Sequence, residues 1–152
     1  MERRLTAILA ADVVGYSRLM GANESGTLAA LDALRTDFIN PKLSEHQGRI
    51  VKLTGDGMLV EFPSVVNAVA CAAELQRGFR KRNAGAPQDQ RIEFRMGVNV
   101  GDVIVQGEDI FGDGVNVAAR LESIATPRWD NDFRTSPRPY WQPARSRFRG
   151  YG

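Results

Sequence analysis

The sequence predicts an α+β fold in which an antiparallel sheet carries its helices on one face. Three observations lead to this class: helical periods that alternate with short apolar runs, an Asp-Gly turn between two of those runs, and one strictly alternating segment. With 152 residues, 43% of them hydrophobic and 25% charged, the chain has the size and composition of one globular domain. We expect that domain to occupy residues 1–127 and an irregular, disordered Arg/Pro-rich tail to follow at 128–152.

The first predicted strand is the apolar run LTAILAADVVG, which ends near Asp12 and is followed by glycine. A helix over residues 23–43 comes next, with Asn23 or Ser25 as its expected N-cap. Its apolar side chains recur at helical spacing, at Leu28, Leu31, Leu34 and Phe38. A buried strand followed by an amphipathic helix is the first half of a crossover connection.

A hairpin and a second helix follow. The short apolar runs at 49–53 and 58–62 are separated by Thr-Gly-Asp-Gly, and Asp-Gly between apolar runs is a strong hairpin signal. Residues 64–82 have a helical stripe of apolar side chains, with Ser64 as the expected N-cap. The chain therefore continues as two antiparallel strands and a second crossover helix.

Residues 91–100 alternate strictly, with Phe94, Met96 and Val98 on one side and charged or amide residues on the other. This pattern predicts a half-buried strand. Residues 102–106 continue that strand or pair with it beyond Gly101. A third helix is expected over residues 114–125, with Asp113 as its N-cap.

The order strand, helix, strand, strand, helix, strand is that of the ferredoxin-like βαββαβ fold. Right-handed crossovers leave the first two strands parallel, with room for one strand between them. The third strand, returning from the hairpin, fills that space and runs antiparallel to the first. Asp12, at the end of the first strand, should therefore lie beside Asp56 in the hairpin turn.

Two adjacent aspartates need a compensating charge. Ionised carboxylates about 4 Å apart repel by roughly 4 kcal/mol at an effective dielectric constant of about 20. An oxygen-only pair without a Cys or His cluster favours Mg²⁺ or Mn²⁺. The glycine after Asp12 adds a strand-to-helix turn that can bind an anion. Together these features indicate a nucleoside triphosphate site, although each aspartate alone is compatible with a structural role, Asp56 in its turn and Asp12 as a cap.

The second Gly-Asp-Gly is interpreted differently, because Asp113 precedes a helix and most simply caps it. Asn116 and Arg120 are four residues apart and project from the same face of that helix. An amide and a guanidinium on one face suit the stabilisation of developing negative charge. The alternative is a solvated pair without a role in chemistry.

Charge and composition limit the partners. Residues 1–127 have a net charge of −2, and the overall +2 comes from the arginines of 128–152, so no nucleic-acid partner is expected for the domain. No apolar run reaches the length of about 18 residues that a membrane span needs. A single cysteine, Cys71, suits a reducing compartment. We expect a cytoplasmic protein without a membrane anchor.

Four segments together resemble the catalytic domain of class III adenylate/guanylate cyclases, in their compact bacterial form: ADVVGYS, IVKLTGDGMLVEF, FRMGVNVGDVI and DIFGDGVNVAARLE. The resemblance covers about residues 3–127. It implies that Asp12 and Asp56 bind two metal ions together with the Val13 carbonyl. It also implies that backbone amides hold the phosphates at Gly15, Tyr16 and Ser17.

The same resemblance assigns the remaining site residues. Lys52 corresponds to the lysine that recognises the purine and Asp109 to its partner, a combination similar to the adenine-selecting pair. Asn116 would orient the ribose and Arg120 would stabilise the transition state. The implied reaction converts ATP to 3′,5′-cyclic AMP and pyrophosphate, with Mg²⁺ or Mn²⁺ as cofactor. The implied site lies between two subunits, and because this chain carries both sets of residues, a homodimer with two sites is expected.

The sequence departs from the family pattern after residue 127, where the family continues with a glycine-rich turn, further strands and a helix. A tail of different composition stands there, and an out-of-frame reading of a longer domain is one hypothesis for it. The alternative function is a catalytically silent dimerisation or nucleotide-sensing module. A ferredoxin-like RNA-binding protein ranks last, since the strands lack exposed aromatic residues on which bases could stack.

Overall fold

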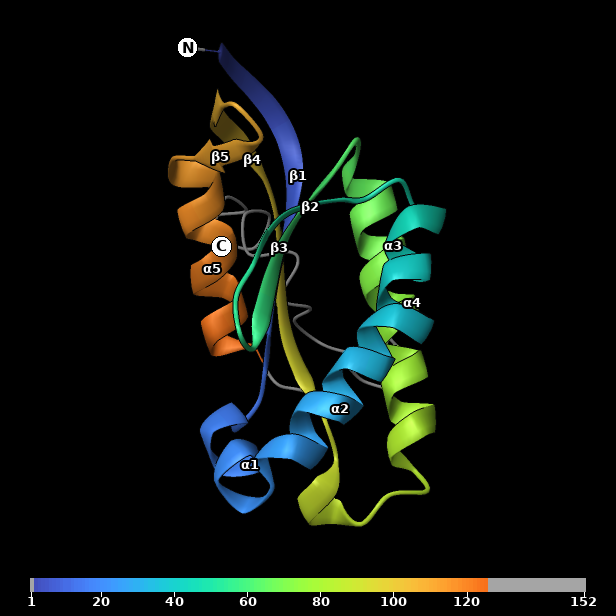
Figure 1. Ribbon diagram of the computed structural model, residues 1–152. Helices are drawn as coiled ribbons and strands as arrows, with labels where there is room; N and C mark the ends of the chain where they lie inside the picture. The colour runs from blue at the N-terminus through green and yellow to red at the C-terminus, as the bar shows by residue number, and fades with distance from the viewer. Residues whose placement is uncertain (1, 126–152) are drawn as a thin grey trace.

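The computed structural model describes residues 2–125, so the predicted tail at 128–152 lies outside the described residues. Helices and strands follow one another in the predicted order, with a short helix at 16–22 and a short strand near residue 110 added (Figure 1). The elements are β1 (Glu2–Val13), α1 (Tyr16–Ala22), α2 (Glu24–Leu34), the π-helical turn η1 (Arg35–Ile39), α3 (Asn40–Glu45), β2 (Arg49–Leu53), β3 (Gly57–Phe62), α4 (Val65–Asn83), the 3-10 turn η2 (Gln88–Gln90), β4 (Phe94–Gln106), β5 (Asp109–Phe111) and α5 (Asp113–Ile124).

The five strands form one antiparallel sheet in the order β2-β3-β1-β4-β5. β3 lies between β1 and β2, as the crossover argument predicted, so the βαββαβ core is confirmed. β5 was not predicted, because three residues between two turns carry no periodic signal. It extends the sheet beyond β4 and places β2 and β5 at opposite edges.

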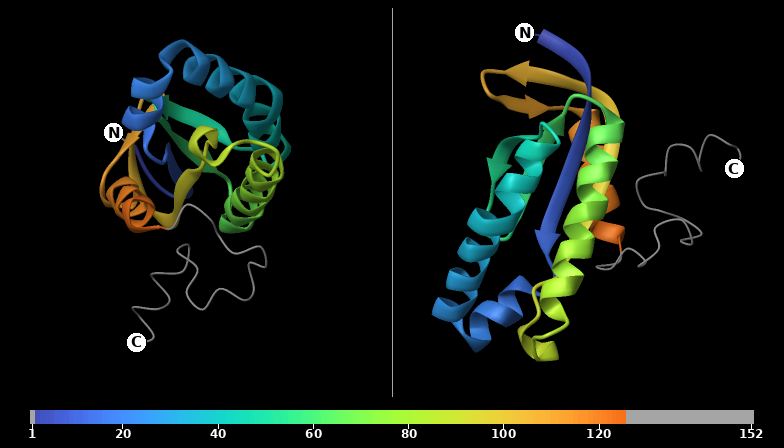
Figure 2. Two further views of the ribbon diagram at one scale, coloured as in Figure 1. Left: turned by 90° about the horizontal axis from the view of Figure 1, so that it is seen from below. Right: turned by 90° about the vertical axis from the view of Figure 1, so that its right-hand side faces the viewer.

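The two faces of the sheet are covered by different helices. On β1, Leu9 and Ala11 pack into the larger core with α1 to α4, whereas Ile8 and Ala10 pack into a smaller core with α5. Figure 1 shows α5 on one side of the sheet and α3 and α4 on the other, and Figure 2 gives two further views. The expectation of helices on one face therefore holds for the two crossover connections and not for α5. The physical reason is that β1 is apolar on both faces, so its second face also needs a cover.

β4 runs without a break through Gly101, so the two predicted segments form one strand. α5 lies so close to this strand that a side chain at Gly97 would clash with the helix backbone, its Cβ coming 2.6 Å from the Ala118 carbonyl oxygen. Glycine in β4 is therefore a requirement of helix packing. This close approach brings the last turn of α5 to the end of the sheet at which β1 ends.

The helix caps test the sequence predictions directly. The Asn23 side chain accepts a hydrogen bond from the Gly26 N–H (3.0 Å), and Ser64 accepts one from the Asn67 N–H (3.2 Å), so both caps are confirmed. The prediction for Asp113 is wrong, because Gly112 is the N-cap and Asp113 is the first helical residue. In that position the carboxylate still favours the helix dipole. No helix in the described residues is long and apolar enough to cross a membrane.

Candidate active site

Asp12 and Asp56 lie on neighbouring strands at one end of the sheet. Asp12 pairs in register with Gly57, the first residue of β3. The N–H of Val13 donates a 2.8 Å hydrogen bond to the carbonyl oxygen of Asp56. The proximity predicted from the topology is therefore confirmed at the level of the backbone.

The hairpin turn owes its shape to the second glycine of its Gly-Asp-Gly. A Cβ atom at Gly57 would lie 2.7 Å from the Ala11 carbonyl oxygen and 3.2 Å from the Cβ of Asp12. The Thr54 N–H donates to the Gly57 carbonyl (3.0 Å) and closes the turn through the backbone. The Asp56 carboxylate is thus not needed to hold the turn, and its side-chain contact with Thr54 is long at 3.5 Å.

Two further charged side chains meet Asp12. Arg95 is the register partner of Asp12 on β4, with its Nε 3.9 Å from Asp12 Oδ1. Glu122 lies close to Asp12, in the last turn of α5. Burial, followed by the interaction with the neighbouring Asp12 carboxylate, raises the pKa of Glu122 to about 8. At neutral pH the Glu122 carboxyl is therefore mostly protonated.

We call Asp12, Asp56, Glu122 and Arg95 the carboxylate rim. It holds three carboxyl groups against one guanidinium, and the buried Oδ1 of Asp12 accepts no hydrogen bond from the described residues. A buried carboxylate oxygen without a donor is costly unless a cation or a proton compensates it. Oxygen ligands of this kind suit Mg²⁺ or Mn²⁺. The rim therefore fits the predicted metal.

Val13 takes part in the rim through its backbone alone. Its side chain is 4% exposed and belongs to the larger core, on the opposite face of β1 from Asp12. The carbonyl group, by contrast, lies directly after the aspartate at the end of β1. This placement is compatible with the predicted role of the carbonyl as a ligand.

A second group of possible metal ligands lies away from this rim, between α3 and α4. Ligand atoms of Glu45, His46 and Glu74 lie within 4.8 Å of one another. The ammonium of Lys42 is 3.2 Å from Glu45 and 3.1 Å from Glu74. These hydrogen bonds, with Glu74 first, raise the pKa of Lys42. The Lys42 ammonium thus already offsets part of the negative charge of this cluster.

The predicted phosphate-binding turn has the expected conformation. Gly15 is the N-cap of α1 and has φ 63°, in the left-handed region that glycine adopts most readily. Tyr16 and Ser17 begin the helix, so their N–H groups belong to the first turn, which has no intrahelical acceptors. A Cβ placed on Gly55 would lie 3.5 Å from the Tyr16 hydroxyl. The turn at Gly15 is therefore next to the hairpin turn that carries Asp56.

Lys52 and Asp109 form an ion pair, with 3.5 Å between Nζ and Oδ2. They come from β2 and β5, the opposite edges of the sheet, so the curl of the sheet brings these edges together. The other carboxylate oxygen of Asp109 accepts a hydrogen bond from the Ile110 N–H (2.8 Å). Half of the Lys52 side chain is exposed, and the pair is open to a ligand.

Asn116 and Arg120 are exposed on α5. Within the described residues neither side chain has a hydrogen bond or ion pair with the carboxylate rim or with the Lys52–Asp109 pair. A single copy of the chain thus gathers two parts of the predicted site and leaves the third facing outward.

Sequence reasoning missed Arg95 and Glu122. Arg95 was placed on the polar side of its strand, and its position opposite Asp12 depends on the register between β1 and β4, which the sequence does not fix. Glu122 reaches the rim because α5 covers the second face of the sheet and packs closely at Gly97. The small residues in β4 were the available signal for that close packing.

Comparison with known proteins gives a consistent family assignment. The model of the adenylate and guanylate cyclase catalytic domain matches residues 3–129. A Rhizobium meliloti protein named "Putative adenylate cyclase 3" is 54% identical over 127 residues, 84% of this chain and 22% of that protein. A Streptomyces coelicolor adenylate cyclase is 33% identical over 129 residues, 82% of this chain and 31% of that protein. The chain therefore spans less than a third of the length of these two relatives.

Solved structures agree with this assignment. The adenylate/guanylate cyclase/hydrolase from Silicibacter pomeroyi superposes with a TM-score of 0.77 at 48% identity, covering 83% of this chain and 73% of that one. The guanylyl cyclase Cya2 superposes with a TM-score of 0.69 at 26% identity, covering 82% and 72%. From its sequence and its fold, the chain belongs to the adenylate and guanylate cyclase catalytic domain family.

Proposed function

We propose that the chain is an adenylate cyclase domain, which converts ATP to 3′,5′-cyclic AMP and pyrophosphate at the interface of a homodimer. The observation that carries the proposal is the adjacency of Asp12 and Asp56, with a buried Asp12 oxygen that lacks a donor. In a chain of this family, that arrangement is the expected signature of a metal-dependent phosphoryl site. Residues 1–127 would form the catalytic domain.

Asp12, Asp56 and the Val13 carbonyl would hold two Mg²⁺ or Mn²⁺ ions. When bound, such ions lower the pKa of a coordinated hydroxyl and neutralise charge on the phosphates. Arg95 adds a fixed positive charge at the same place. The N–H groups after Gly15 would bind the triphosphate oxygens, because the first turn of a helix offers unpaired donors.

The Lys52–Asp109 pair supports ATP as the substrate. Adenine presents an amino donor at N6 and an acceptor at N1, which match a carboxylate acceptor and an ammonium donor. Guanine presents a carbonyl acceptor at O6 and an N–H donor at N1, so the same pair would be matched in the wrong order. The pair also keeps its own charges balanced at 3.5 Å when no base is bound.

The reaction needs one bond to form and one to break. The ribose 3′-oxygen attacks the α-phosphorus and its proton passes to water, while the bond from that phosphorus to the bridging oxygen breaks and pyrophosphate leaves. Asn116 would orient the ribose and Arg120 would stabilise charge on the phosphorus oxygens. Both project outward from α5, so a second copy of the chain would supply them to the carboxylate rim of the first.

Incubation of the purified chain with ATP and Mn²⁺ tests the proposal, with cyclic AMP as the readout and Asp12→Ala as the comparison. We expect metal-dependent product from the native sequence and a loss of at least about a hundredfold in the variant. The second candidate, a silent nucleotide-binding or dimerisation module, is favoured by the departure from the family pattern after residue 127. Binding of ATP without any cyclic AMP would support that module and contradict the proposed activity.

A further inference from the structure

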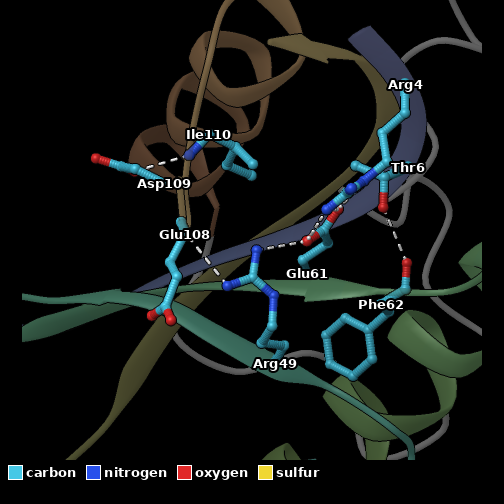
Figure 3. Close-up of polar contacts among 8 residues, drawn as sticks. All are labelled: Arg4, Thr6, Arg49, Glu61, Phe62, Glu108, Asp109 and Ile110. Carbon is cyan, nitrogen blue, oxygen red and sulfur yellow. Dashed lines mark hydrogen bonds and ion pairs between the residues drawn. The ribbon is translucent and has the colours of Figure 1, made fainter. Parts of the chain in front are cut away.

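We propose that Arg49 is a positioning residue for purine recognition, which holds Lys52 and Asp109 together by linking β2 to the turn that precedes β5. The inference rests on the proposed function, since it assigns the Lys52–Asp109 pair to the base. It concerns a group of side chains that the predicted site does not include. We call Arg4, Glu61 and Arg49 the arginine clamp (Figure 3).

The clamp is built around one buried carboxylate. Glu61, on β3, is 7% exposed and accepts hydrogen bonds from Arg4 Nε and Nη2 (both 2.9 Å) and from Arg49 Nη2 (2.8 Å). The second terminal nitrogen of Arg49, Nη1, donates to the Glu108 carbonyl oxygen at 3.0 Å. Figure 3 shows the Arg49 guanidinium between Glu61 and the backbone that leads into Asp109. One planar group thus joins the middle of the sheet to the start of β5.

Glu61 stays charged despite its burial. Burial opposes ionisation, but the hydrogen bonds from Arg49 and Arg4 outweigh it and lower the pKa of the carboxyl below its ordinary value. Charge-assisted bonds of this kind are short and directional. The carboxylate therefore fixes the orientation of the Arg49 guanidinium.

A β-bulge places Arg49 and Lys52 on the same face. Residues three apart in a regular strand point to opposite faces of the sheet. Here the register shifts between Ile50 and Lys52, so that Arg49 pairs with Glu61 and Lys52 pairs with Leu59. Glu61 and Leu59 are two residues apart and share a face. The irregularity in β2 thus aims both cationic side chains at β5.

The Lys52–Asp109 pair is too weak to hold the two sheet edges by itself. Its separation is 3.5 Å, and the side chains are 50% and 35% exposed. Exposed ion pairs of this kind contribute little to stability. The Arg49 bond to the Glu108 carbonyl lies one residue from Asp109 and has a buried anchor at its other end. The clamp is therefore the stronger link, and the purine pair depends on it for its spacing.

Arg49→Gln and Arg4→Gln form a matched pair of variants. Each removes one guanidinium from Glu61, and the two arginines are similarly exposed, at 43% and 39% of the side chain. Arg49→Gln alone also removes the bond to Glu108. Arg49→Lys keeps the charge but cannot donate to both acceptors in a planar fork, so it should behave like Arg49→Gln.

Two measurements decide the matter: the ratio of kcat/KM for ATP to that for GTP, and amide hydrogen exchange at residues 109–111. We expect Arg49→Gln and Arg49→Lys to lower the ratio and to speed the exchange by about tenfold, the size of one lost bond to a charged group. Arg4→Gln should change the kcat/KM ratio and the exchange rate by less than about twofold each. Equal effects of the Arg4 and Arg49 variants would overturn the inference.

The design separates this inference from the proposed function. If the native chain makes no cyclic nucleotide, the proposed activity fails, and the exchange comparison still decides whether Arg49 holds β5. If the native chain is active and the exchange at residues 109–111 is unchanged in Arg49→Lys, only the clamp is wrong. Arg49→Lys is used for this comparison because it keeps a positive charge beside Glu61. It therefore still provides a test if Arg49→Gln fails to fold.

Discussion

The carboxylate rim and the arginine clamp are two groups of charges in one sheet, and they are balanced in opposite ways. In the clamp, two guanidinium groups surround one buried carboxylate, and the pKa of Glu61 is lowered. In the rim, three carboxyl groups share one guanidinium, and the pKa of Glu122 is raised to about 8. The clamp is complete without a ligand, whereas Asp12 and Asp56 in the rim have only the Arg95 guanidinium as a positive partner among the four rim residues. The difference distinguishes a structural network from the site that is proposed to bind a cation.

The largest expected effect comes from a change in the rim. Asp56→Asn should reduce cyclic AMP formation by about a thousandfold, because it removes a charged oxygen ligand from the proposed metal site. The thermal midpoint without metal should stay the same or rise, since a like charge has been removed from beside Asp12. Activity and thermal unfolding of the same preparation check both parts.

Asp113→Asn is the matched control, because Asp113 stands in the other Gly-Asp-Gly and begins α5. It should leave cyclic AMP formation within about threefold of the native rate, in keeping with the small contribution of a helix-dipole charge. An equal loss in the two variants would show that the rim is not the centre of the chemistry.

A change in the arginine clamp should instead lower the stability of the fold. Glu61→Ala leaves two arginines without their shared carboxylate, and we expect it to lower the free energy of unfolding by about 3 kcal/mol, as for other broken buried ion pairs. Urea unfolding at neutral pH measures this change. Glu108→Ala provides the control, because its carbonyl, not its side chain, accepts the bond from Arg49. A loss below about 1 kcal/mol for Glu61→Ala would place the clamp among ordinary surface pairs.

Metal ions should sharpen the contrast. A ligand that binds only the folded state adds about 2.7 kcal/mol of stability at a hundred times its dissociation constant. Mn²⁺ at saturating concentration should therefore raise the thermal midpoint of the native chain and of Glu108→Ala by several degrees. Asp12→Asn should lose this response. A full response in Asp12→Asn would direct attention to the cluster at Glu45, His46 and Glu74.

The sequence predicted the connectivity well and the second face of the sheet poorly. Apolar runs, the Asp-Gly turn and the caps at Asn23 and Ser64 are local signals, and they sufficed for the βαββαβ core and for the neighbourhood of Asp12 and Asp56. Strand register and the close packing of α5 are not local. The positions of Arg95 and Glu122 in the carboxylate rim were therefore not predicted.

The purine pair shows the same division. The family resemblance predicted that Lys52 and Asp109 form a pair. The structure shows which backbone features bring the two side chains together. The bulge in β2 and the three-residue strand β5 have no periodic signature, and the contact between opposite edges depends on the curl of the whole sheet. A motif can name the residues of such a site, but the backbone that aims them follows from packing.

The smallest expected effect is the pH dependence of the clamp. Because the pKa of Glu61 in the folded chain lies below its ordinary value of 4.5, the unfolded chain takes up the proton first as the pH falls. The stabilisation from Glu61 is thus fully present above about pH 5, and it is lost as the pH falls through the lower pKa of the folded state. Glu61→Gln should therefore lose less unfolding free energy than the native chain between about pH 5 and pH 3, by an amount smaller than the effect of Glu61→Ala at neutral pH. Urea titrations across this range test the sign, with Glu108→Gln keeping the native slope. Parallel slopes for Glu61→Gln and the native chain would mean that the two arginines do not hold this carboxylate in its charged form.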